Sequence, residues 1–125
     1  MNKYERLKEA LEKDGKGSMK CFGNSMLPIL TNPSFCVYAR QEDYEIGNIV
    51  FCRVRGRYID AHLITKKDDK RYMISNNHNH DNGWTKTIYG MVVEAYNKDN
   101  KIIYQVVPTK DKEKDGRDQR TNRDA

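Results

Sequence analysis

The apolar positions near the start of the chain follow a helical period. Tyr4, Leu7, Ala10 and Leu11 recur at helical spacing, and Lys and Glu occupy the other positions. The polar stretch Asp-Gly-Lys-Gly at residues 14–17 ends the pattern. The sequence therefore predicts a short helix over residues 3–13, packed on the rest of the chain as an N-terminal lid and joined by a linker that ends at residue 17.

From residue 18 the pattern changes to short apolar runs separated by turn residues. Such runs, rich in β-branched and aromatic residues, are typical of hairpins in an all-β domain. We therefore expect one mainly β domain over residues 18–107. Its strands are predicted at residues 18–22, 35–39, 48–54, 57–65, 71–75, 88–96 and 101–107, with a polar loop at residues 76–83.

Composition adds three limits. A chain of 125 residues favours a single domain. The net charge is +5, but Lys and Arg are mixed with Asp and Glu along most of the chain, which indicates a solvated surface rather than a nucleic-acid footprint. Residues 108–125 contain no apolar anchor, so we expect a disordered charged tail there.

Cysteine usage and hydropathy indicate a cytoplasmic protein. Cys21, Cys36 and Cys52 lie in apolar runs and form no Cys-x-x-Cys pair, so we expect buried free thiols in a reducing compartment. The N-terminus shows no secretory signal pattern. No stretch approaches the roughly 20 apolar residues of a membrane span.

The strongest candidate for chemistry is a short serine box, Gly23-Asn24-Ser25-Met26-Leu27-Pro28. Acyl transfer needs a nucleophile, a base and donors for the oxyanion. Ser25 supplies the nucleophile, Gly23 lets a substrate approach the backbone, and N–H groups of Gly23, Asn24 or Met26 can face the oxyanion. The plain alternative is an ordinary connection between a strand and a turn.

The candidate base is His62, on a predicted strand with period-2 alternation. Tyr58, Asp60, His62 and Ile64 are predicted to share one face, with Ile59, Ala61 and Leu63 on the other. A neutral imidazole at pH 7 suits a general base. The alternatives are a half-exposed structural histidine and, for Asp60, a solvated carboxylate.

These segments together resemble the LexA-like and signal-peptidase-like serine peptidases. The serine box resembles that of the family. Residues 44–51 resemble its following Gly-Asp-Ile-Val strand, with Asn48 in place of the usual Asp, and Ala61-His62-Leu63-Ile64 falls where the family carries its base. The histidine resembles the archaeal and endoplasmic-reticulum branch. The resemblance covers residues 18–95 and implies a barrel-like, hairpin-rich fold and serine peptidase activity by a Ser25–His62 dyad.

The resemblance also implies an acidic box, which this chain carries in altered form. Ser75-Asn76-Asn77 matches the family's Gly-Asp-Asn, so Asn76 stands where the acid is expected, and Asp81 is the alternative partner for His62. His78, His80 and Asp81 lack a fourth local ligand for zinc. We therefore expect no metal and no cofactor.

Three functions follow from these features. The first is cleavage of a polypeptide partner, without self-processing, in a protein that fits a phage or mobile element. The second is an inactive peptidase-fold module that binds a protein by strand addition. The third and least favoured is nucleic-acid binding through Arg53, Arg55 and Arg57, since about 17 residues before the β domain are too few for a helical DNA-binding domain. The oligomeric state stays open.

Overall fold

The computed structural model describes residues 1–108 of the chain. It opens with helix α1, Lys3–Asp14. The Asn2 side chain accepts from the Glu5 N–H, Glu5 caps the Asn2 N–H in return, and Gly15 closes the other end at φ 75°. Leu7 and Leu11 are buried, so the predicted helix and its packing are confirmed. The predicted tail lies outside the described residues, apart from Pro108.

Eight antiparallel strands and the turns and loops that join them make up the rest of the described chain, which confirms a mainly β protein. The strands are β1 (Lys16–Cys21), β2 (Ser34–Ala39), β3 (Ile49–Val54), β4 (Arg57–Lys67), β5 (Tyr72–Ser75), β6 (Asp81–Thr85), β7 (Thr87–Tyr96) and β8 (Ile102–Gln105).

One expected loop is partly a strand. Residues 81–83 were predicted as loop, but they begin β6, which pairs with β5. Gly83, with φ 134°, lies opposite Ile74, and a Cβ there would meet a Val54 methyl at 3.2 Å. Glycine is needed for this close approach, so its presence marked a packed strand rather than a turn.

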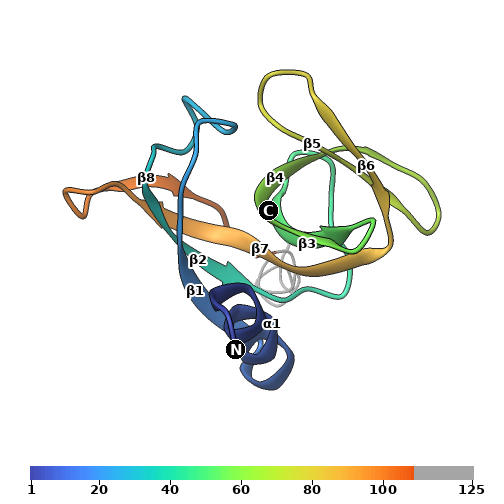
Figure 1. Cartoon of the computed structure of the whole chain (residues 1–125), viewed down its shortest axis with the longest axis horizontal. Helices are drawn as coiled ribbons and strands as arrows, with labels where there is room; N and C mark the ends of the chain where they lie inside the picture. The colour runs from blue at the N-terminus through green and yellow to red at the C-terminus, as the bar shows by residue number, and fades with distance from the viewer. Residues whose placement is uncertain (109–125) are drawn as a thin grey trace, which may run out of the picture.

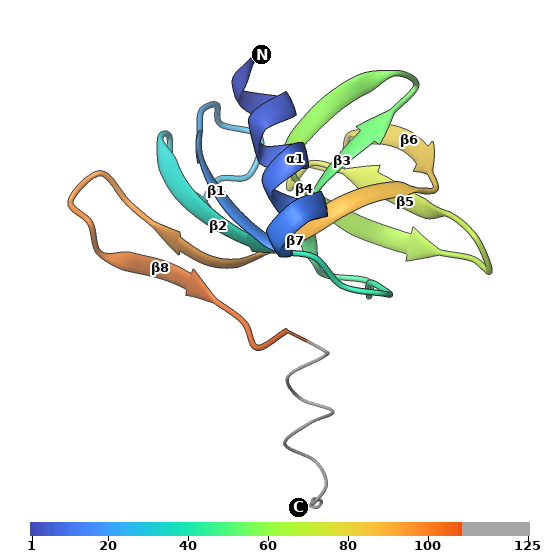
Figure 2. The same cartoon turned by 90° about the horizontal axis from the view of Figure 1, so that it is seen from below.

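The sheet follows the order β1-β2-β7-β3-β4-β5-β6, with β8 also paired to β7 (Figure 1). β7 joins the two parts of the sheet, because its first half pairs with β3 and its second half pairs with β2 and β8. Helix α1 lies along β1 and β7 (Figure 2). One apolar cluster packs beneath the helix, and a second lies among β3, β4, β5 and β7.

A β-bulge in β4 overturns the predicted face pattern. Cys52 pairs with Ile59 while Val50 pairs with His62, so β4 carries one more residue than β3 over this interval. Ile59 therefore packs with Ile64 in the second cluster, and Tyr58 packs with Ala61 and Leu63 in the first. The prediction that Tyr58 shares a face with Ile64 is wrong, since the bulge reverses the alternation.

The three cysteines are buried and free, as the sequence predicted. None of the helices within residues 1–108 is both long and apolar enough to cross a membrane.

Candidate functional site

The serine box forms a tight turn between β1 and β2. The Leu27 N–H donates to the Asn24 carbonyl at 3.2 Å, and the Leu30 N–H donates to the Met26 carbonyl at 3.0 Å. Met26 is 4% exposed and packs in the cluster beneath the helix. The turn is thus anchored by the residue that follows Ser25, while Ser25 itself is half-buried.

Asn32 braces the first part of this turn. Its side-chain oxygen accepts from the Gly23 N–H at 2.9 Å, and its amide nitrogen donates to Asn24 Oδ1 at 3.2 Å. The Gly23 N–H is therefore occupied and does not face an oxyanion in this conformation. The N–H groups of Ser25 and Met26 have no hydrogen-bond partner within residues 1–108, so they remain available.

The loop between β5 and β6 holds the turn from the other side. The Asn77 N–H donates to the Ser25 carbonyl at 2.8 Å, and Asn77 Nδ2 donates to the Leu27 carbonyl at 2.9 Å. His78 Nε2 lies 3.2 Å from the Asn24 carbonyl oxygen. Two segments about 50 residues apart in the chain therefore meet at the serine.

Asn76 and Asp81, the two predicted partners of His62, make other bonds. Asn76 Oδ1 accepts from the backbone N–H groups of His78 and His80 at 2.8 and 3.0 Å. Asp81 Oδ1 accepts from Ser75 Oγ at 2.7 Å. Both side chains shape the β5–β6 loop, and neither hydrogen-bonds to the imidazole of His62.

His62 lies on β4 and is half-buried. Nδ1 is buried and has no hydrogen-bond partner within residues 1–108. Burial lowers the pKa of His62, and the negative charge of Asp60 opposes that shift. The imidazole is therefore neutral at pH 7, the protonation state that a general base requires.

Ser25 and His62 are not hydrogen-bonded to each other in the described part of the chain. His62 pairs directly with Val50, and residues that face each other across antiparallel strands share one side of the sheet. Val50 belongs to the second cluster, whereas Met26, next to Ser25, belongs to the first. The dyad stays a prediction, because no contact between the two side chains is seen within residues 1–108.

A small cavity beside Ser25 is also lined by Asp60, whose carboxylate was expected from the sequence to be solvated. It measures about 20 Å³ and is lined by Ser25, Cys21, Phe22, Asp60 and Ala61, among others. That volume suffices for about one water molecule. Asp60 is half-buried, and its Oδ1 accepts from the Ala61 N–H at 3.0 Å. The bulge in β4 places it there, and an alternation pattern cannot reveal a bulge.

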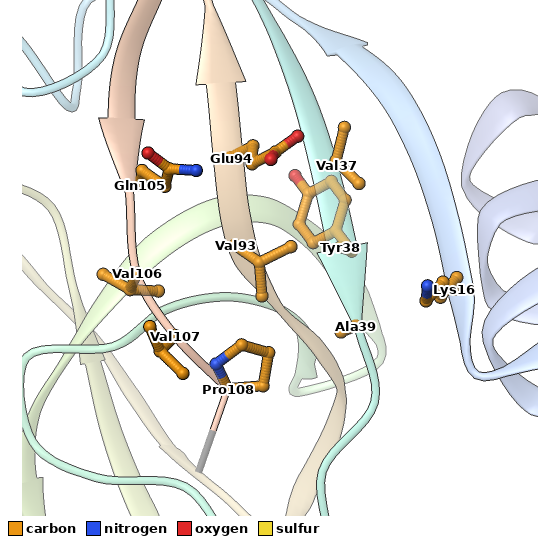
Figure 3. Close-up of a pocket in the computed structure, with 10 residues that line it drawn as sticks. All are labelled: Lys16, Val37, Tyr38, Ala39, Val93, Glu94, Gln105, Val106, Val107 and Pro108. Atoms are coloured by element: carbon orange, nitrogen blue, oxygen red, sulfur yellow. The ribbon is translucent and has the colours of Figure 1, made fainter. Parts of the chain in front are cut away.

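A larger cavity lies away from the serine. It measures about 570 Å³ and lies between β2, β7 and β8 (Figure 3). Val37, Val93 and Val106 contribute apolar walls, and Lys16 and Glu94 are its charged lining residues. It contains no nucleophile and base in contact, so it offers no rival catalytic site.

No cluster of three or more potential ligands suited to a metal ion occurs among residues 1–108.

A comparison with the models of known protein families finds no match, and a comparison with curated protein sequences finds none either.

Proposed function

We propose that this protein is a serine peptidase-like domain of the LexA-like and signal-peptidase-like type, with Ser25 as nucleophile and His62 as general base. The observation that carries the proposal is the pair of hydrogen bonds from Asn77 to the serine turn, to the Ser25 and Leu27 carbonyls. They hold the turn while the Ser25 hydroxyl keeps no hydrogen bond within residues 1–108. The substrate is a polypeptide, and the three buried free thiols favour action in the cytoplasm.

The chemistry follows the general scheme of serine acyl transfer. Neutral His62 takes the Ser25 proton as Oγ attacks a peptide carbonyl, and it returns that proton to the leaving amine. The unpaired N–H groups of Ser25 and Met26 stabilise the oxyanion. Asp60, whose charge raises the pKa of His62, stabilises the imidazolium in place of Asn76 or Asp81. Catalytic hydrogen bonds often tighten only when substrate binds.

Active-site labelling tests this proposal. The wild-type protein is incubated with a fluorophosphonate probe, and the modified residue is located by mass spectrometry. We expect labelling of Ser25 that is lost in Ser25→Ala and strongly reduced in His62→Ala. Ser18→Ala, at an exposed serine of β1, is the matched control and keeps full labelling. A folded wild type that stays unlabelled overturns the proposal.

The second candidate is an inactive peptidase-fold module that binds a protein partner. The bonds that Asn76 and Asp81 make to other groups favour it, because neither residue then orients His62. Under this hypothesis Ser25→Ala leaves partner binding unchanged and the probe labels nothing. The labelling experiment therefore separates the two functions.

A further inference from the structure

A groove between the N-terminal helix and the edge of the sheet carries an apolar surface without a partner. It measures about 390 Å³ and is lined by α1, β1 and the start of β2. Its floor includes Leu7 and Met19 of the core. Phe22 and Phe35 line it with 60% and 48% of their surfaces exposed. Two exposed aromatic rings in one groove form the kind of patch that marks an interaction site.

The charged residues that line the groove are all basic. Lys3, Arg6 and Lys20 line it, and no acidic side chain is among the described residues that do so. The ammonium groups of Lys3 and Lys20 lie 5.1 and 5.6 Å from the centroid of the Phe22 ring. The groove thus combines an apolar floor with a cationic rim, and its complement is an apolar side chain flanked by negative charge.

We propose that this groove docks an acidic peptide segment that carries a large apolar or aromatic residue. The apolar residue packs between Phe22 and Phe35, and the flanking carboxylates pair with Lys3, Arg6 and Lys20. The chain's own residues 109–125 contain no large apolar side chain and cannot supply this anchor. The occupant that we propose is a segment of another protein.

The groove favours a peptide over a single-stranded nucleic acid. Bases bind such surfaces by stacking on open aromatic faces. Here the ammonium groups of Lys3 and Lys20 lie by the Phe22 ring, and Phe35 is the less exposed of the two aromatic residues, which suits one apolar side chain better than a row of stacked bases. Leu7 and Met19 on the floor of the groove suit a hydrocarbon side chain and not a phosphodiester. The proposal does not depend on hydrolysis at Ser25.

Fluorescence anisotropy with a defined probe tests the docking site on the full chain. The probe is fluorescein-labelled Asp-Glu-Asp-Phe-Glu-Asp-Leu-Glu, and the reference peptide has Ser in place of Phe and Leu. We expect saturable binding of the probe that weakens with salt, and binding at least about tenfold weaker for the reference peptide. Failure of the probe to bind at millimolar concentration overturns the proposal.

Surface variants locate the binding. Phe22→Ser and Lys20→Glu each change an exposed residue of the groove, and we expect probe affinity to fall about tenfold in both. Ile46→Ser and Lys86→Glu are matched changes at exposed residues outside the groove and keep wild-type affinity. Equal affinity in all variants places the peptide elsewhere and refutes the proposal.

Oligothymidylate that displaces the probe from the wild type, and binds more tightly than the probe does, identifies a nucleic acid as the occupant instead. Because the Ser25→Ala variant is expected to bind the probe normally, failure of docking and failure of catalysis are separate results.

Discussion

The burial of His62 has a measurable consequence for the pH dependence of stability. Burial lowers the pKa of this histidine from 6.5, the interaction with His80 lowers it further, and Asp60 and the Ala61 backbone raise it. The unfolded chain therefore binds a proton at higher pH than the folded chain does. Stability linked to His62 is complete above about pH 6.5 and falls as the pH decreases through the interval between the two pKa values.

The expected size follows from the single proton involved. One group contributes a slope of at most about 1.4 kcal/mol per pH unit to the free energy of unfolding. Asp43 and Asp68 have pKa values lowered from 3.8 by their partners Lys67 and Arg71. Their stabilising contributions are lost only below about pH 3.8. They do not interfere in the range where His62 titrates.

The assay is urea denaturation followed by the fluorescence of Trp84, the one tryptophan of the chain. The free energy of unfolding is measured between about pH 4.5 and 7.5 for the wild type, His62→Gln and His78→Gln. We expect the acid slope to be reduced in His62→Gln and kept in His78→Gln, an exposed matched control. Superimposable curves for the wild type and His62→Gln refute the argument that the ring is buried and neutral.

Two further variants test the packing that positions the serine. Leu11→Ala removes a fully buried side chain of α1, so we expect a loss of about 2–5 kcal/mol in the free energy of unfolding. The loss is measured with urea against Lys13→Ala as an exposed control, and a loss below about 1 kcal/mol contradicts the assigned packing. Asn77→Ala removes the 2.9 Å bond from Nδ2 to the Leu27 carbonyl, so we expect a loss of about 1 kcal/mol together with slower fluorophosphonate labelling of Ser25. Unchanged labelling kinetics show that the bond does not position the serine.

Much of the fold was predictable because local signals agree with the tertiary structure. The helix carries its apolar period and its caps in sequence, and seven of the strands were expected near their observed positions. β6 was missed because Asn82 and Gly83 have the composition of a turn, whereas the glycine is explained by its φ of 134° and by the neighbouring Val54. The bulge in β4 was missed because one extra residue leaves no mark in an alternation pattern.

The candidate site was predictable in its residues but not in its bonds. The serine box and His62 stand out by residue type and order. The contact of Asn77 with the serine turn joins segments 50 residues apart, and the polar loop at residues 76–83 gave no sign of which of its amides would make it. Asn76 and Asp81 bond instead within the β5–β6 hairpin, which the match to an acidic box could not reveal.

The hydrogen bonds around Ser25 fix the backbone of the serine turn, but they do not include the imidazole of His62. Met26 in the core, Asn32 on one side and Asn77 on the other hold the backbone of the turn. The Nδ1 atom of His62 is buried and has no hydrogen-bond partner within residues 1–108. A buried polar atom without a partner costs free energy, so a substrate that supplies a partner for Nδ1 recovers that cost on binding. In the proposed peptidase the backbone around the nucleophile is therefore preset, and the contact between Ser25 and His62 must form when the substrate binds.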